Sequence, residues 1–178
     1  MNRCDGKTAL LAELMENRGQ LIACDRDPMR LETLQKNIRR LGATVVETVR
    51  HDWQSGSLQT KSEAQLFDRI LVDAPCTNTG VLRRRVDLRW RLTAQDFVRM
   101  PEVQWQILSA VIPHLRAGGS LVYSTCSIEA EENEEVVQRA LKEFAFLELK
   151  ETRSMLPFRD HFDGAFAARL RRVRGAVI

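Results

Sequence analysis

Two of the four cysteines stand in short polar motifs that each follow an apolar segment, residues 73–76 (DAPC) and 124–127 (STCS). A buried structural cysteine usually lies in mid-strand among apolar residues, as Cys24 does, whereas Cys76 and Cys126 stand beside Pro, Thr and Ser. A thiol in such a setting can act as a nucleophile, because its thiolate attacks electron-poor carbon. We therefore predict a reactive Cys126, with a small core residue as the alternative interpretation.

Three aspartates follow short apolar segments in the same way. Asp25 could accept both hydroxyls of a ribose, as acids in this place do in dinucleotide-binding folds. Asp25 or Asp27 could instead cap a helix that opens at Pro28, so both interpretations stay open. Asp52 could accept from an adenine amino group, or it is an ordinary loop acid. Asp73 opens the first cysteine motif.

Alternating helices and strands must position these groups. Apolar spacing and β-branched runs predict an α/β fold with a mostly parallel sheet covered by helices on both faces. In such a sheet, ligands bind beyond the carboxyl ends of the strands, so the aspartates and Cys126 should share one rim. A helix N-terminus just after Cys126 would favour its thiolate. The predicted helices are 7–17, 28–41, 93–115 and 129–143, and the predicted strands are 20–24, 44–49, 67–72, 120–124, 144–150 and 165–173.

Length and composition fit a single domain. The chain has 178 residues, 44% of them hydrophobic and 29% charged, with a formal net charge of +3. No apolar run reaches the roughly 20 residues of a membrane span, and the first residues have no signal-peptide core, so we expect a cytoplasmic protein without a membrane partner. The three histidines do not flank the cysteines at zinc-ligand spacing, so no metal site is expected. We also expect a monomer.

A basic segment follows the first cysteine motif. It carries Arg83, Arg84, Arg89 and Trp90, which could contact phosphates and stack on a base. A run of charge is more often a solvated loop. Its place beside the predicted rim favours contact with RNA.

Taken together, these motifs resemble the Sun/Nop family of RNA cytosine-5 methyltransferases, whose best-known bacterial member modifies small-subunit ribosomal RNA. The resemblance covers nearly the whole chain. Its most specific part is the pair of Pro-Cys and Thr-Cys motifs in the family's order. The matching segments are 23–27 (ACDRD), 37–42 (NIRRLG), 73–76 (DAPC), 79–84 (TGVLRR), 87–90 (DLRW), 123–127 (YSTCS), 131–134 (EENE) and 163–170 (DGAFAARL).

The resemblance implies a Rossmann-like fold that binds S-adenosyl-L-methionine. It implies that Cys126 is the nucleophile and that Cys76 assists release of the methylated product. For the remaining residues it implies binding of ribose by Asp25, of adenine by Asp52, and of the methyl donor or the target base by Asp73. Gly6 and Lys7 resemble the end of the glycine-rich cofactor loop, although alone they are too short to be specific.

The chain departs from the family at its beginning. The family has a strand leading into Cys-Ala-Ala-Pro-Gly-Gly-Lys, of which only residues 4–7 (CDGK) are present here. We therefore expect an N-terminally truncated methyltransferase domain, with its first strand missing or incomplete and with weak cofactor binding. Smaller departures are Arg85-Val86 where His-Pro is usual, Asn78 where a small residue is usual, and Ala130 where Pro is common.

The leading hypothesis is methyl transfer from S-adenosyl-L-methionine to carbon 5 of a cytosine in RNA, with ribosomal RNA as the expected partner. A catalytically inactive RNA-binding fragment without a complete cofactor site is the alternative. A third hypothesis is another nucleoside-cofactor enzyme on the same fold, against which the two cysteine motifs argue.

Overall fold

A computed structural model describes residues 3–56, 58 and 66–173. Its residues group into two compact units, 1–55 and 56–178, and each unit is described by itself. The described strands accordingly form two separate sheets. The expectation that the whole chain forms one methyltransferase domain stays a prediction.

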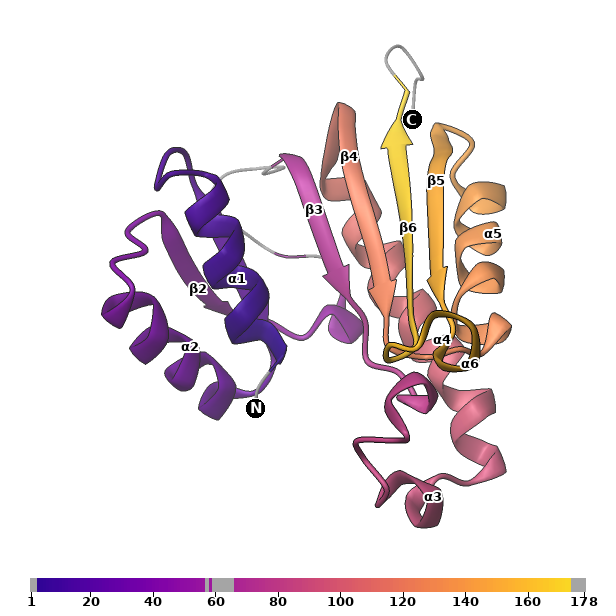
Figure 1. Cartoon of the computed structure of the whole chain (residues 1–178). Coiled ribbons are helices and arrows are strands. Elements are labelled where there is room, and N and C mark those ends of the chain that lie inside the picture. The colour runs from indigo at the N-terminus through magenta and orange to yellow at the C-terminus, as the bar shows by residue number, and fades with distance from the viewer. Residues whose placement is uncertain (1–2, 57, 59–65, 174–178) are drawn as a thin grey trace. The chain divides into compact units, whose positions relative to one another are not determined.

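The first unit contains two helices and two parallel strands (Figure 1). The elements are α1 (Arg3–Leu14), β1 (Leu21–Asp25), α2 (Pro28–Arg40), β2 (Val46–Arg50) and the short 3-10 helix η1 (Trp53–Ser55). The face of α2 that bears Leu31, Leu34 and Ile38 is buried, as the sequence spacing predicts. Pro28 opens this helix, because a first-turn residue needs no free N–H.

The first helix differs from its prediction at both ends. The sequence predicts residues 7–17, whereas α1 spans Arg3–Leu14. Glu16 and Asn17 adopt positive φ angles of 52° and 54°, which a continuing right-handed helix does not allow. The chain therefore leaves the helix before the glycine at position 19, which the prediction took as the end signal.

The second unit contains a four-stranded sheet in the order β3-β4-β6-β5. Its strands are β3 (Phe67–Asp73), β4 (Leu115–Thr125), β5 (Leu147–Met155) and β6 (Ala165–Arg172). β3 pairs with β4 in parallel, whereas β6 runs antiparallel to both β4 and β5. The prediction of a mostly parallel sheet is therefore confirmed, because β3, β4 and β5 run in one direction and, among the described strands of this sheet, only β6 runs the other way. The segment between β5 and β6 is too short for the crossover that a parallel pair requires.

Helices and 3-10 turns complete the second unit. The α-helices are α3 (Leu88–Arg91), α4 (Ala94–Val111), α5 (Glu134–Glu143) and α6 (Pro157–Asp160). The 3-10 turns are η2 (Thr79–Val81), η3 (Ile112–His114) and η4 (Ala130–Glu132). α4 and α5 lie side by side, since Trp105 of α4 contacts Phe144 and stacks under the Arg139 guanidinium of α5.

The long predicted helix 93–115 ends early, and the following strand begins early. α4 starts with a reciprocal capping box between Thr93 and Asp96, and hydrogen bonds from Thr93 hold the pKa of Asp96 below its usual value. Pro101 lies within α4 without ending it. Pro113 falls in η3, directly after the helix, where a proline cannot continue the α-helical hydrogen bonds. The glycines predicted to stop the helix instead lie inside β4, where Gly118 has φ 78° and the pairing with β3 is irregular.

The core of the second unit lies between the sheet and its helices. Its fully buried side chains come from α4, η3, β4, α5 and β6, and they are Leu108, Ile112, Leu115, Leu121, Tyr123, Val137 and Leu170. Within the residues that the structure describes, none of the helices is both long and apolar enough to span a membrane.

Candidate active site

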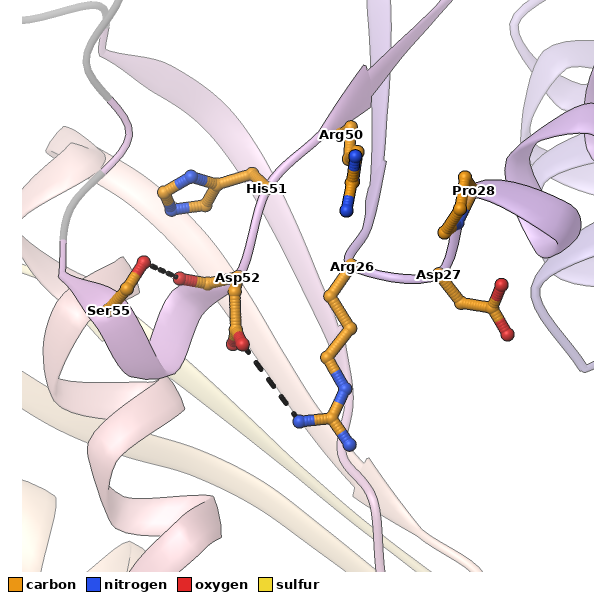
Figure 2. Close-up of a pocket in the computed structure, with 7 residues that line it drawn as sticks. All are labelled: Arg26, Asp27, Pro28, Arg50, His51, Asp52 and Ser55. Carbon is orange, nitrogen blue, oxygen red and sulfur yellow. Dashed lines mark hydrogen bonds and ion pairs between the residues drawn. The ribbon is translucent and has the colours of Figure 1, made fainter.

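The carboxyl ends of β1 and β2 meet at a pocket of about 620 Å³ in the first unit (Figure 2). Because the two strands are parallel, Asp25 lies opposite Arg50, and the His51 N–H donates to the carbonyl oxygen of Asp25 over 3.1 Å. The register thus brings the ends of both strands to the same edge, as predicted. The lining residues are Arg26, Asp27, Pro28, Arg50, His51, Asp52 and Ser55.

Asp25 does not cap α2, which settles one of the open alternatives. Asp27 is the N-cap, and its carboxylate accepts from the Met29 N–H at 2.9 Å. Asp25 accepts from the Asp27 N–H at 2.8 Å, and its other oxygen lies 3.6 Å from the Arg30 guanidinium. The Asp25 side chain is only 11% exposed. The Asp27 N–H and the Arg30 guanidinium thus both hold the Asp25 carboxylate in place.

Asp52 is more open. Its carboxylate accepts from the Gln54 N–H at 3.0 Å and lies 3.9 Å from the Arg26 guanidinium. The Asp52 side chain is 42% exposed and lines the pocket, whereas Asp25 does not. Gly6 and Lys7 lie inside helix α1 rather than in a loop. Their part in cofactor binding stays a prediction.

The carboxyl ends of β3 and β4 bring the two motif cysteines into contact in the second unit. Asp73 lies opposite Ser124 in this parallel pair, and the Ser124 hydroxyl lies 3.4 Å from the Asp73 carboxylate. The strands end just beyond, and the sulfurs of Cys76 and Cys126 lie 3.1 Å apart. Asp73, Cys76 and Cys126 therefore share one site. Whether Asp25 and Asp52 belong to the same rim stays a prediction.

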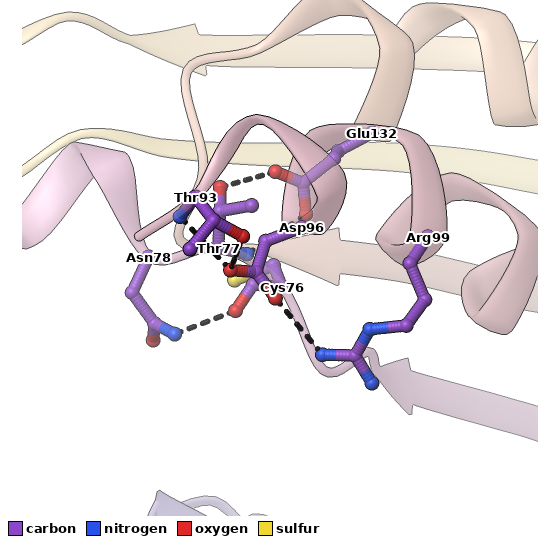
Figure 3. Close-up of polar contacts among 7 residues, drawn as sticks. All are labelled: Cys76, Thr77, Asn78, Thr93, Asp96, Arg99 and Glu132. Atoms are coloured by element: carbon purple, nitrogen blue, oxygen red, sulfur yellow. Dashed lines mark hydrogen bonds and ion pairs between the residues drawn. The ribbon is translucent and has the colours of Figure 1, made fainter. Parts of the chain in front are cut away.

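A buried carboxylate, that of Glu132, ties the two cysteine segments together (Figure 3). Its oxygens accept from the Thr77 N–H at 3.0 Å, from the Thr77 hydroxyl and from the Ser127 hydroxyl at 2.9 Å. Gln104 of α4 donates a fourth hydrogen bond through Nε2 at 2.7 Å. A buried carboxylate needs such donors. Since Thr77 and Ser127 directly follow the two cysteines, one carboxylate positions both segments.

Further hydrogen bonds fix the segment around Cys126. Asn133 accepts from the Thr125 hydroxyl at 2.6 Å and donates to the Ser127 carbonyl at 3.1 Å. The buried Tyr123 hydroxyl donates to the backbone carbonyl of Glu132 at 2.7 Å. This network occupies the stretch that the sequence predicts as the start of helix 129–143.

The prediction that a helix begins just after Cys126 is wrong. A loop and the 3-10 turn η4 follow the cysteine, and α5 begins only at Glu134. Asn133 between them has φ −113° and ψ −91°, which is not helical. The Cys126 sulfur therefore does not lie at the N-terminus of an α-helix, and a helix dipole does not favour its thiolate as predicted. From the sequence, Glu132 is predicted to be one of several acids in the first turns of that helix. In the structure it is instead the buried acceptor that joins the two cysteine segments.

Two glycines allow the backbone around the thiols to pack closely. The Gly80 N–H donates to the Cys126 carbonyl at 3.0 Å, and the Gly164 N–H donates to the Gly80 carbonyl at 2.7 Å. A Cβ on Gly80 would lie 2.5 Å from the Gly164 carbonyl oxygen, closer than packed atoms approach. Only glycine fits there, so segments near positions 80, 126 and 164 are held together by their backbones.

The two units hold their thiols differently. The hydrogen bond with Cys126 and burial raise the pKa of Cys76 well above the usual range, so Cys76 stays protonated. Burial, with the charge of Glu47, raises the pKa of Cys24 to about 11. Cys24 is therefore an unreactive structural thiol, as its place in mid-strand predicts.

The basic segment is partly neutralised within the chain. Arg83 and Arg84 contact the two oxygens of Asp163 at 2.6 and 2.7 Å, and their hydrogen bonds hold the pKa of this carboxyl below its usual value. No sequence signal links these arginines to an acid about 80 positions away. Arg89 and Trp90 lie on α3, and the Trp90 side chain is 86% exposed.

The structure shows no candidate metal centre in the part of the chain that it describes, since no three His, Cys, Asp or Glu side chains gather there as ligands. The fold is the α/β fold of S-adenosylmethionine-dependent methyltransferases. Solved structures of related proteins share this fold.

The chain belongs to the family of 16S rRNA methyltransferases RsmB/F, whose model matches residues 4–171. It is 39% identical over 172 residues to ribosomal RNA small subunit methyltransferase B of Shigella sonnei and, equally, of Escherichia coli. This match covers 93% of the chain but only 39% of each relative, so the chain spans about two fifths of their length. Members of the family are S-adenosylmethionine-dependent RNA cytosine-5 methyltransferases.

Two solved structures resemble the chain at more than 30% identity. The crystal structure of PH0851 has a TM-score of 0.87 and 32% identity, and it covers 94% of this chain and 40% of that one. The structure of NSun6 from Pyrococcus horikoshii with SFG, an analogue of S-adenosylmethionine, has a TM-score of 0.83 and 33% identity. It covers 95% of this chain and 45% of that one.

Proposed function

We propose that this chain carries out methyl transfer from S-adenosylmethionine to carbon 5 of a cytosine in RNA, through a covalent adduct at Cys126. The observation that carries the proposal is the 3.1 Å contact between the Cys76 and Cys126 sulfurs at the ends of adjacent parallel strands. A single buried cysteine could be structural. Two cysteines held in contact by a dedicated hydrogen-bond network are typical of a reaction that needs two thiols.

The chemistry of cytosine requires such a nucleophile. Carbon 5 is too electron-poor to take a methyl group directly. Addition of the Cys126 thiolate to carbon 6 makes carbon 5 nucleophilic, as in other covalent catalysis that divides one difficult step into two easier ones. After methylation, a water molecule takes the proton on carbon 5, the C–H electron pair re-forms the double bond between carbons 5 and 6, and the bond between sulfur and carbon 6 breaks, which releases the product and the Cys126 thiolate.

Cys76 and Asp73 have supporting roles in this proposal. The raised pKa of Cys76 keeps a proton within 3.1 Å of the Cys126 sulfur, where it can protonate the thiolate that leaves carbon 6. Asp73 ends β3 beside Ser124 and is only partly buried. Its carboxylate is placed to hydrogen-bond a base that enters beside the two sulfurs.

The ends of β1 and β2 fit the nucleoside part of the cofactor. The Asp25 carboxylate at the end of β1 is an acceptor that suits ribose hydroxyls, and Asp52 lines an open pocket as an acceptor suited to an amino group. When bound, S-adenosylmethionine supplies an electrophilic methyl group on a sulfonium. We assign Gly6 and Lys7 to the same cofactor only by their resemblance to the family loop.

RNA binding is assigned to the basic segment. The exposed Trp90 offers a stacking surface, and Arg89 on the same short helix can contact phosphate. Arg83 and Arg84 can bind phosphate only if they contact it beside Asp163 or break their ion pairs with Asp163. The names of the related enzymes support small-subunit ribosomal RNA as the substrate.

Trapping on RNA that carries 5-fluorocytosine tests the proposal, because fluorine cannot leave carbon 5 as a proton does. We expect the chain, with saturating S-adenosylmethionine, to form a protein–RNA adduct that survives a denaturing gel. Cys126→Ser should form none, and the control Cys24→Ser should form it normally. An adduct with Cys126→Ser would refute the assignment. RNA binding without any adduct would favour the inactive RNA-binding fragment instead.

A further inference from the structure

Asn78 contacts both cysteine segments at once. It lies two positions after Cys76 and adopts a left-handed backbone conformation, φ 63° and ψ 27°. Its side-chain Nδ2 donates to the backbone carbonyl of Cys76 at 2.6 Å (Figure 3). Its Oδ1 lies 3.0 Å from the sulfur of Cys126.

The orientation of this amide follows from its partners. A backbone carbonyl can only accept, so the amide nitrogen of Asn78 must face the Cys76 carbonyl. The amide oxygen is then the atom that faces the Cys126 sulfur. An amide oxygen also can only accept. The contact is therefore favourable when Cys126 carries its proton and unfavourable when it is a thiolate.

Other groups around Cys126 act in both directions. Cys76 can donate its own proton to the Cys126 sulfur across 3.1 Å, which favours the thiolate. Asp73 at the end of β3 and Glu132 of η4 are the acidic groups of this site, and their negative charge disfavours the thiolate. Asn78 differs from the Cys76 thiol because its amide oxygen, 3.0 Å from the Cys126 sulfur, can accept a hydrogen bond and cannot donate one.

We propose that Asn78 is a catalytic residue that keeps Cys126 protonated in the free protein. When the target cytosine of the RNA displaces the amide oxygen, the Cys126 thiol can lose its proton. The proposal rests on the proposed role of Cys126 as nucleophile. It concerns one equilibrium, in which Cys126–SH loses its proton to solvent and becomes the thiolate. Because the thiolate is the form that reacts with electrophiles and oxidants, Asn78 protects the nucleophile until RNA is bound.

The rate of alkylation by iodoacetamide, measured for each cysteine by peptide mass spectrometry from pH 6 to 10, tests this proposal. Asn78→Gly removes the amide and tolerates the positive φ. We expect it to lower the apparent pKa of Cys126 by about one unit and to raise its alkylation rate at pH 7 about tenfold. Cys24 in the same sample is the internal reference, and its rate should not change.

Two further variants separate the amide from the backbone. Asn78→Ala removes the same oxygen but strains the left-handed backbone, so it should lower the apparent pKa of Cys126 as Asn78→Gly does. Asn78→Asp keeps the shape and adds negative charge, so it should raise that apparent pKa. An unchanged or higher apparent pKa of Cys126 in Asn78→Gly, with unchanged alkylation of Cys24, would overturn the proposal.

This measurement uses neither RNA nor cofactor. Failure of the adduct test would therefore remove the assigned methyl transfer and leave the alkylation result standing. A failure of the alkylation test would remove the role of Asn78 and leave the adduct assignment intact.

Discussion

The two strand-end sites differ in how firmly their polar groups are held. At the ends of β1 and β2, the Arg26 and Asp52 side chains are 67% and 42% exposed and lie 3.9 Å apart. At the ends of β3 and β4, Gln104, Ser127 and Glu132 are completely buried and hydrogen-bonded. Surface ion pairs contribute little and rearrange easily, whereas a buried network fixes one geometry.

The difference matches what each site has to do in the proposed reaction. A covalent step depends on reacting atoms being placed within fractions of an ångström, so the thiols gain from a rigid support. A nucleoside is held by hydrogen bonds that can form as it arrives. We infer that the thiol site is preformed and that the pocket at β1 and β2 adapts to its ligand.

Cys76→Ser should give the largest effect on turnover. The shorter side chain of serine places its proton farther from the Cys126 sulfur than the Cys76 thiol does, so protonation of the departing Cys126 thiolate should slow. We expect methyl transfer to fall by about 10²-fold or more, as for loss of a general acid. The adduct should accumulate on ordinary RNA, visible on a denaturing gel without 5-fluorocytosine. Normal turnover in Cys76→Ser would remove Cys76 from the mechanism.

Glu132→Gln should give the largest effect on stability. A glutamine has one acceptor oxygen and places N–H groups against the donors that the carboxylate satisfies, so we expect a loss of about 3 kcal/mol in the free energy of unfolding. Urea denaturation measures it. Glu131→Gln is the matched control, because Glu131 is exposed on the same turn and should change stability by less than about 0.5 kcal/mol. Equal effects of the two variants would contradict the buried network.

An added methyl group should have opposite effects on stability in the two units. Gly80→Ala places a Cβ 2.5 Å from the Gly164 carbonyl oxygen and 2.8 Å from that of Cys126, so we expect a loss of about 2 kcal/mol. Gly6→Ala meets nothing within 4 Å and lies in helix α1, where alanine should stabilise by about 0.5–1 kcal/mol. Thermal unfolding of both variants checks the sign as well as the size. A harmless Gly80→Ala would show that the backbones near the thiols are not tightly packed.

Asp25→Asn should weaken cofactor binding about tenfold. An amide keeps the acceptor for the Asp27 N–H but loses the second carboxylate oxygen that we assign to the ribose, which is worth about 1.5 kcal/mol. Isothermal titration calorimetry with S-adenosylmethionine measures the change. Asp27→Asn is the control, because asparagine also caps a helix. Equal losses in both variants would indicate a general effect of charge at this pocket.

The effect that is smallest near neutral pH is that of Cys24, because it develops only as the pH rises into the alkaline range. Its folded-state pKa is raised to about 11 by burial and by Glu47, so the folded state favours the neutral thiol. A raised pKa contributes stability below the unfolded value, and that contribution is lost as pH rises through the folded value. Between about pH 9 and 11 the wild-type chain should lose stability relative to Cys24→Ala. Parallel stability curves over this range would show that Cys24 is not shielded.

The sequence predicts the elements better than it predicts how they join. The helix at Pro28 and the strands that end at Asp25 and Asp73 follow from local spacing and capping, and the structure confirms them. The antiparallel pairing of β6 and the early end of α4 depend on long-range contacts and on one proline, which periodicity does not resolve.

The sites show the same division. The paired cysteine motifs predict two thiols at strand ends of one sheet, and the structure shows that their sulfurs lie 3.1 Å apart. The buried role of Glu132 could not be predicted, since an acidic run before a helix has the same pattern whether one member turns inward or not. In the sequence Asn78 is only an unusual residue in its motif, because its contact with Cys126 depends on a left-handed backbone conformation.

The most direct test of Cys126 as the nucleophile is to map the RNA adduct to a single sulfur. The unsubstituted chain is trapped on 5-fluorocytosine RNA, digested with trypsin and nuclease, and sequenced by mass spectrometry. We expect the methylated base to be attached to the peptide that contains Cys126, with Cys76 unmodified. Attachment to Cys76, or to neither cysteine, would contradict this expectation.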